Sequence, residues 1–307
     1  MRDNRAVTHP ETLDQTAPLN PTFVADVVRR ALDEDLGGDP GVDVTTLATI
    51  DSRTQVRGAV VARQAGVIAG VDVIAATVQQ VAMRCAVPTP EVTVLVGDGT
   101  EVAAGTTVAR IVGAGHAVLI AERTILNLMS RACGVATHTR RWVEALAGTG
   151  ARVLDTRKTT PTLRELDKYA VRCGGGTNKR FGLYDVAMVK DNHIVAAGSV
   201  AAAIGAIRER FPEVEVQVEV ESEQQAFAAL DAGATFLMLD NLSVAEMTPL
   251  VASIRAAQPR YGRVWIEATG GLALDNAREV ALSGVDFMSV GALTHSSAIL
   301  DLGLDLD

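Results

Sequence analysis

The sequence is poor in aromatic residues and cysteines and has no long apolar run. Aromatic side chains make up 4% of the 307 residues, so a large core must be built from Ala, Val, Leu and Ile. The chain has three cysteines, and no two of them have the CxxC spacing of a redox or metal motif. We therefore expect reduced, buried cysteines in a cytoplasmic protein.

The chain also lacks a long apolar segment and a net positive charge, which excludes membranes and nucleic acids as main partners. The longest uncharged run, residues 192–207, is shorter than the ~18 apolar residues that a membrane helix requires. Residues 1–21 are polar and lack the apolar core of a signal peptide, so we expect a disordered tail there. The net charge of −9 disfavours binding to nucleic acid or to an anionic membrane.

Lysine is also scarce, and its distribution is uneven. Only four of the 28 basic residues are lysines, and all four lie between Leu154 and His193. This window holds eight basic and five acidic residues in an otherwise acidic chain, which indicates an anion-binding site. The lysines are Lys158, Lys168, Lys179 and Lys190. Among them, Lys168 falls within a helical pattern and is expected to be a surface charge.

The first part of the chain predicts a mixed α/β domain over residues 22–130. Apolar residues recur at helical spacing from Pro21, and strand-like runs at 91–96 and 106–112 flank a Gly-Asp-Gly turn signal. Residues 117–146 predict a long helix or a helix pair, and Arg123 is one of its polar positions.

Past Gly150 the chain repeats one unit. Six short apolar runs each end in polar or glycine residues, and helical stretches such as 162–172, 200–210 and 222–232 lie between them. Strands that alternate with helices form parallel sheets. Because charged residues stand at every strand end, we predict a barrel, and six strands instead of eight make it an incomplete one.

The strand ends carry three kinds of groups. The cationic groups suit carboxylates and phosphates, and the carboxylates suit Mg²⁺ or ribose hydroxyls. The glycine turns after the last two strands suit a phosphate. The cations are Arg157, Lys158, Lys179, Arg180 and Lys190, the carboxylates are Glu219, Glu221 and Asp240, and the glycine turns are Thr269-Gly270-Gly271 and Gly291.

These groups together indicate a Mg²⁺-dependent enzyme that acts on a phosphate-bearing substrate and a second anionic one. Two alternatives stay open at this point. Lys158 or Lys190 could form a Schiff base in an aldolase-like barrel lyase. The barrel could also be a non-catalytic phosphosugar sensor. His193 is interpreted as structural, because no second histidine stands at ligand spacing.

A set of short motifs occurs in order over residues 22–307. They are ALDEDLG (31–37), AERTILNLMS (121–130), LDTRKTTP (154–161), KYAVRCGGG (168–176), MVKDNH (188–193), EVE (219–221), MLDN (238–241), TGG (269–271) and SVGALTHS (289–296). These motifs and their order resemble those of the quinolinate phosphoribosyltransferase family, the carboxylating nicotinate-nucleotide pyrophosphorylases among the type II phosphoribosyltransferases.

This resemblance implies an N-terminal α/β sandwich domain over 22–130 and an incomplete six-stranded barrel over 131–290. It also implies that the C-terminal segment 291–307 returns towards the first domain, and that the protein is a homodimer. The implied reaction converts quinolinate and phosphoribosyl pyrophosphate, with Mg²⁺, into nicotinate mononucleotide, pyrophosphate and CO₂ in NAD biosynthesis. A paralogous transferase acting on another anionic ring is the alternative within this fold.

The resemblance also assigns roles to residues. Lys158, Glu219 and Asp240 are the expected catalytic residues, and Glu219 and Asp240 are expected to serve Mg²⁺ through water or substrate. Arg123 is expected to reach the partner subunit's site. Lys179 stands where the family usually has histidine. The expected substrate-binding residues are Arg123, Thr156, Arg157, Lys158, Lys179, Arg180, Lys190, Glu219, Asp240, Thr269, Gly270, Gly271, Val290, Gly291 and Ala292.

Overall fold

The structure is a computed structural model, and it describes residues 17–307. Residues 1–16 of the predicted disordered tail lie outside the described residues. The rest of that segment, residues 17–21, is ordered, because Leu19 is buried and the Asn20 side chain accepts a hydrogen bond from the Thr22 N–H at 2.9 Å. Asn20 thereby caps the first helix, and Pro21 occupies its first turn.

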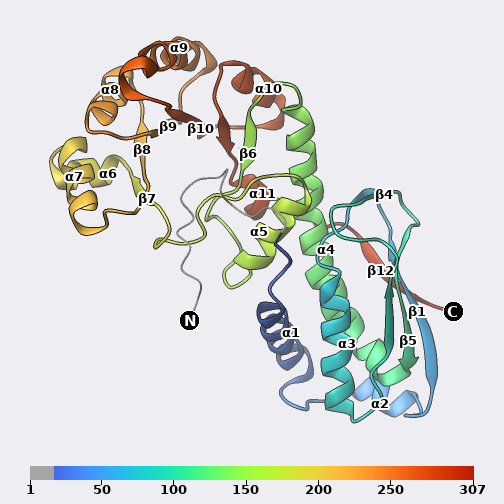
Figure 1. The fold of residues 1–307 in the computed structure, drawn as a ribbon. Coiled ribbons are helices and arrows are strands. Elements are labelled where there is room, and N and C mark those ends of the chain that lie inside the picture. Colours follow the sequence, from blue (N-terminus) through green and yellow to red (C-terminus); the bar gives the residue numbers. More distant parts are fainter. Residues whose placement is uncertain (1–16) are drawn as a thin grey trace. The chain divides into compact units, whose positions relative to one another are not determined.

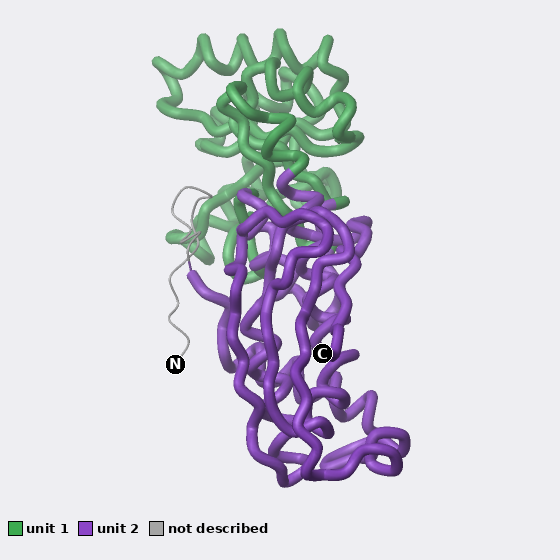
Figure 2. Tube along the Cα trace, turned by 90° about the vertical axis from the view of Figure 1, so that its right-hand side faces the viewer, with its two compact units in different colours: residues 1–15, 141–158, 176–292 green, residues 16–140, 159–175, 293–307 purple. Residues whose placement is uncertain are grey.

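The described residues fall into two compact units (Figures 1 and 2). The sheet unit contains residues 17–140, 159–175 and 293–307, and the barrel unit contains residues 141–158 and 176–292. Each unit is assembled from separate stretches of the chain. No helix within residues 17–307 is both long and apolar enough to cross a bilayer.

The sheet unit is built on a four-stranded antiparallel sheet in the order β12-β1-β5-β3. Its strands are β1 (Gln55–Ala62), β3 (Glu91–Val94), β5 (Thr107–Ala114) and β12 (Leu302–Leu306). Strand β12 comes from the C-terminal segment and pairs along β1. The predicted hairpin exists as the β3–β5 pair, but its connection is long enough to contain β4 (Glu101–Val102), which pairs with β2 (Gly66–Val67).

Helices complete the sheet unit. They are α1 (Pro21–Leu36), α2 (Val44–Thr49), α3 (Asp72–Cys85), most of α4 (Gly115–Ala145) and α5 (Arg164–Cys173). The predicted helix or helix pair at 117–146 is thus one helix, α4.

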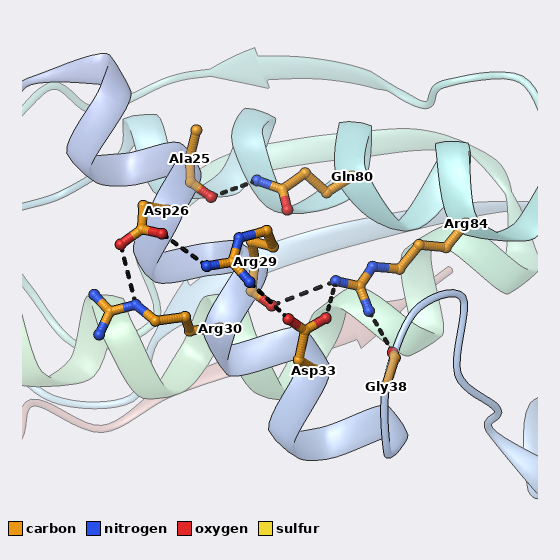
Figure 3. A network of polar contacts seen from close by, with 8 residues as sticks. All are labelled: Ala25, Asp26, Arg29, Arg30, Asp33, Gly38, Gln80 and Arg84. Carbon is orange, nitrogen blue, oxygen red and sulfur yellow. Dashed lines mark hydrogen bonds and ion pairs between the residues drawn. The ribbon is translucent and has the colours of Figure 1, made fainter.

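A polar network joins α1 to α3 beside the apolar contact of the two helices (Figure 3). The guanidinium of Arg84 on α3 donates to the Asp33 carboxylate at 2.6 Å and to the Gly38 carbonyl at 2.8 Å. The Gln80 amide donates to the Ala25 carbonyl at 2.8 Å. Arg84 therefore ties α3 both to α1 and to the turn that follows it.

The barrel unit contains a six-stranded parallel sheet in the order β6-β11-β10-β9-β8-β7. The consecutive strands β6 and β7 lie at opposite edges and do not pair, so the barrel is open between them. The predicted fold class, an α/β sandwich domain with an incomplete six-stranded barrel, is therefore confirmed. The strands are β6 (Arg152–Leu154), β7 (Ala187–Val189), β8 (Val216–Val220), β9 (Phe236–Asp240), β10 (Trp265–Thr269) and β11 (Phe287–Ser289).

Five helices lie on the outer side of the parallel strands, and Figure 1 shows them around the sheet. They are α6 (Asp191–Ala197), α7 (Val200–Arg210), α8 (Glu223–Asp231), α9 (Val244–Tyr261) and α10 (Leu274–Leu282). The short helix α11 (Ala292–His295) follows β11. The helix predicted at 162–172 is α5, and it belongs to the sheet unit instead of covering the barrel.

The inside of the barrel is filled by large apolar side chains. Leu154, Phe236, Met238 and Phe287 form a buried cluster, and the Phe236 and Phe287 rings stack with centroids 5.8 Å apart. Successive strand side chains alternate between faces, so residues two positions further along face the same interior. The core therefore forms the floor under the carboxyl ends of the strands.

Gly134 on α4 provides a test of packing in the sheet unit. A Cβ at this position would overlap the backbone of Ala298 and lie 2.9 Å from the Ile299 Cα. We expect Gly134→Ala to lower the free energy of unfolding by about 1–3 kcal/mol, because backbone atoms cannot move aside easily. Equilibrium denaturant unfolding measures this change.

Gly97→Ala is the matched control in the same unit, since a Cβ there has no atom within 4 Å. The control should change the free energy of unfolding by less than about 0.5 kcal/mol. A Gly134→Ala protein as stable as the control would contradict the packing argument.

Candidate active site

The carboxyl ends of the barrel strands bring together most of the residues that the sequence indicates. Parallel strands end at the same edge of a sheet, so the residues that follow them share one rim. Strand β6 leads into Thr156–Lys158, β7 into Lys190, and β8 and β9 end near Glu219 and Asp240. Strands β10 and β11 lead into the two glycine turns. Arg123 is exposed on α4, in the sheet unit.

The acidic part of the rim lies on neighbouring strands. Glu219 accepts a hydrogen bond from the Lys190 ammonium, with Nζ and Oε1 2.8 Å apart. Partial burial raises the pKa of Asp240 above its ordinary value, the Glu219 charge raises it further, and the Lys190 charge opposes the rise. The carboxylates at these strand ends thus concentrate negative charge that one lysine balances only in part.

Two arginines of the rim lie close enough to repel one another. Burial lowers the pKa of Arg180 from its ordinary value, and the positive charge of Arg157 lowers it further against the Asp185 charge. The Arg180 guanidinium donates to the Val186 carbonyl at 2.9 Å. Arg157 and the neighbouring Lys158 are exposed. Such a group of cations favours an anion with more than one negative charge.

The turn after β10 requires glycine. Gly270 and Gly271 have φ values of 79° and 61°, the left-handed region that other residues rarely adopt. A Cβ on Gly270 would also overlap the side chain of Asn241, whose own backbone N–H donates to the Thr269 carbonyl at 3.0 Å. The turn leads towards α10, which begins at Leu274. Backbone N–H groups in such turns can hold phosphate oxygens.

Lys179 lies inside the barrel. It is buried, and its ammonium lies 2.7 Å from both carboxylate oxygens of Glu267 and 3.2 Å from the Met238 sulfur. Sequence reasoning missed Glu267. Period-two alternation could have found it, because a glutamate between Trp265 and Thr269 faces the interior, and a buried carboxylate there needs a partner.

Lys168 is the second lysine whose position differs from expectation. It is predicted as a surface charge on a helix, yet it is buried on α5. The helical pattern locates the helix correctly but not the face that α5 turns to its neighbours. Asp167, the preceding residue, is also buried, and its Oδ1 lies 3.0 Å from the Arg131 Nε in an ion pair.

Both halves of the chain match models of one family. Residues 43–133 match the quinolinate phosphoribosyl transferase N-terminal domain, and residues 135–305 match the C-terminal domain. A curated relative, the carboxylating nicotinate-nucleotide pyrophosphorylase of Mycobacterium leprae, is 45% identical over 281 residues, which cover 92% of this chain and 96% of the relative.

Solved structures agree with these matches. NadC from Streptococcus pyogenes has a TM-score of 0.86 and 36% identity, covering 95% of this chain and 99% of its own. The nicotinate-nucleotide pyrophosphorylase of Francisella tularensis has a TM-score of 0.84 and 31% identity, covering 95% of this chain and 98% of its own.

Glu215, another carboxylate of the barrel unit, provides a test of the electrostatics of that unit. Burial raises the pKa of Glu215 to about 7, although a hydrogen bond from Gln217 and the Lys179 charge lower it. The folded protein then binds more protons than the unfolded chain between the ordinary value of 4.5 and about 7. Stability must therefore fall as the pH rises through this window, by up to about 3 kcal/mol from this group.

We expect Glu215→Gln to remove that loss, so that the variant gains stability over the wild type at pH 8 but not at pH 4.5. Urea unfolding of both proteins at the two pH values measures the difference. Glu209→Gln, an exposed position of the same unit, is the control and should leave the pH dependence unchanged. Parallel pH profiles of the wild type and Glu215→Gln would contradict the assignment.

Proposed function

This chain belongs to the quinolinate phosphoribosyl transferase family, and we propose that it transfers the phosphoribosyl group of phosphoribosyl pyrophosphate to quinolinate. The products are nicotinate mononucleotide, pyrophosphate and CO₂, a step of NAD biosynthesis. The observation that carries the proposal is that the family models cover both halves of the chain and include the rim of cations, carboxylates and glycine turns.

The cations of the rim are assigned to the acidic substrates. Quinolinate carries two adjacent carboxylates, and the neighbouring guanidiniums of Arg157 and Arg180 fit such a dianion. Lys158 and Lys190 add mobile point charges for a carboxylate or phosphate. Thr156 accepts the Lys158 N–H at 3.0 Å and so fixes the loop that carries these groups. Lys179 lies inside the barrel, where the Glu267 carboxylate balances its charge.

The glycine turns are assigned to the 5′-phosphate of the ribose. Thr269-Gly270-Gly271 and Val290-Gly291-Ala292 follow neighbouring strands, β10 and β11, and the first turn has two consecutive residues with positive φ. Turns of this kind expose backbone N–H groups, which bind phosphate oxygens without a counter-charge.

Mg²⁺ is proposed at Glu219 and Asp240. Among residues 17–307 no group of three or more acidic, histidine or cysteine side chains is arranged to hold a metal ion. Mg²⁺ does not need such a group, because it keeps several waters and binds through one or two carboxylates and substrate phosphates. Burial, and after it the repulsion from Glu219, raises the pKa of Asp240, and a bound cation would relieve that repulsion. Bound Mg²⁺ would neutralise pyrophosphate charge.

The residues of the rim have to orient two anions and balance a change in charge. The quinolinate nitrogen forms a bond to the ribose C1 as the C1–O bond to pyrophosphate breaks, and positive charge develops on the ribose ring. Glu219 and Asp240 can stabilise that charge. The C–CO₂ bond next to the new cationic nitrogen then breaks, its electron pair stays on the ring carbon, and a proton takes its place. Orientation contributes more here than a strong base.

We also propose a cytoplasmic homodimer. The three cysteines are free, as in a reducing compartment. Arg123 is exposed on α4 and so can serve the site of a second subunit.

The first test is turnover of quinolinate with phosphoribosyl pyrophosphate and Mg²⁺, followed as nicotinate mononucleotide. Nicotinate in place of quinolinate is the control, and its preferred use would indicate a paralogous transferase. Lys158→Ala should keep the far-ultraviolet circular dichroism spectrum and reduce turnover at least about 100-fold, because it removes a charge-assisted contact from the rim. Near-normal turnover in Lys158→Ala would overturn the assignment.

The second test concerns Arg123. Lys158→Ala and Arg123→Ala should each be inactive alone, and a mixture that has exchanged subunits should recover about a quarter of wild-type activity, since half of its dimers then hold one intact site. Activity of the mixture is measured after dilution and reassociation. A mixture as inactive as its components would show that Arg123 serves its own subunit or no site.

A further inference from the structure

Glu267 and Lys179 form an ion pair inside the barrel, below the rim. The lysine side chain is 6% exposed and the glutamate 0%, and both carboxylate oxygens lie 2.7 Å from the ammonium. The lysine nitrogen also stands 5.9 Å from the centre of the Phe236 ring. A buried pair of this kind adds little net stability compared with apolar side chains of the same volume, so its main effect is on geometry.

The backbone of Lys179 is held at the open edge of the barrel. Thr177 continues the sheet beside β6, with its N–H donating to the Val153 carbonyl at 2.9 Å. Asp155, at the end of β6, accepts the Lys179 N–H at 2.8 Å and the Asn178 amide at 2.6 Å. The Lys179 side chain then crosses the interior to β10, which is separated from β6 by β11.

Arg180 is the next residue in the chain. Because the Lys179 side chain is anchored at Glu267, it fixes the position of the backbone from which the Arg180 side chain starts. Its guanidinium is held at the other end by the Val186 carbonyl at 2.9 Å, near the charge of Arg157. We propose that Glu267 is a positioning residue, which acts through Lys179 to hold residues 177–180 and to aim Arg180 at the carboxylates of quinolinate. This inference rests on the proposed function for the identity of the anion.

The decisive variant is Glu267→Gln, because Glu267 is fully buried and is not among the residues assigned to a substrate, whereas Lys179 is. We expect its KM for quinolinate to rise about tenfold, the effect of misplacing one charge-assisted hydrogen bond. The KM for phosphoribosyl pyrophosphate should stay within about twofold of the wild-type value, since that substrate is assigned to other strand ends.

A double-mutant cycle shows whether Glu267 acts through Arg180. Once Arg180→Ala has removed the guanidinium, Glu267→Gln should raise the KM for quinolinate no further. Additive effects, or an unchanged KM in Glu267→Gln alone, would overturn the proposal. Arg255→Met is the matched control: it removes another ion pair of the barrel unit, with Asp286 at 2.8 Å, and should change neither KM.

Hydrogen–deuterium exchange tests the positioning step without turnover. Peptides covering residues 177–180 should exchange at least about fivefold faster in Glu267→Gln, because a local restraint is lost. If that variant does not fold, Lys179→Met/Glu267→Met removes both charges and should still show the faster exchange. Unchanged exchange in a folded variant refutes the inference. A wild type that does not use quinolinate refutes the proposed function instead, and the exchange result still decides the role of Glu267.

Discussion

The buried carboxylate of Asp155 is the interaction on which the arrangement of the site depends. It stands at the end of β6, is fully buried, and accepts hydrogen bonds from the Asn178 amide and the Lys179 N–H. An eight-stranded barrel would give β6 a second neighbouring strand, but here β6 is an edge. Backbone pairing at this edge is limited to the bridge between Leu154 and Thr177, and the Asp155 carboxylate extends it to the two residues that follow. It holds a segment that comes more than twenty residues later in the chain against the first strand.

Charge is distributed along the rim in the same order as the strands. Cations follow β6 and β7, carboxylates stand at β8 and β9, and glycine turns follow β10 and β11. The lysine of β7 meets the glutamate of β8, so positive and negative regions meet at the Lys190–Glu219 pair. The cations suit an anionic ring and the carboxylates suit ribose hydroxyls, and the neighbouring strands β7 and β8 place the two regions side by side.

The sequence predicts the strands and their end residues well because both depend on local information. Apolar runs that end in charged residues locate β6 to β11, and the DTRK, KDNH and TGG segments are short motifs. What local information cannot supply is the route of the chain between strands. Helix α5 is predicted correctly as a helix, yet it packs in the sheet unit, because its destination depends on contacts with distant residues such as Arg131.

The same limit applies to the lysines and shows what their scarcity means. All four lie in one window, but two are buried and two stand at strand ends near the rim. An ammonium is compact and can be satisfied by one carboxylate and a sulfur, as Lys179 is by Glu267 and Met238. A guanidinium brings five donors in a rigid plane, which the apolar floor of the barrel could not satisfy. In a chain that otherwise uses arginine, the small size of the ammonium group thus explains lysine at position 179. A count of charges along the sequence cannot distinguish this lysine from the lysines of the rim.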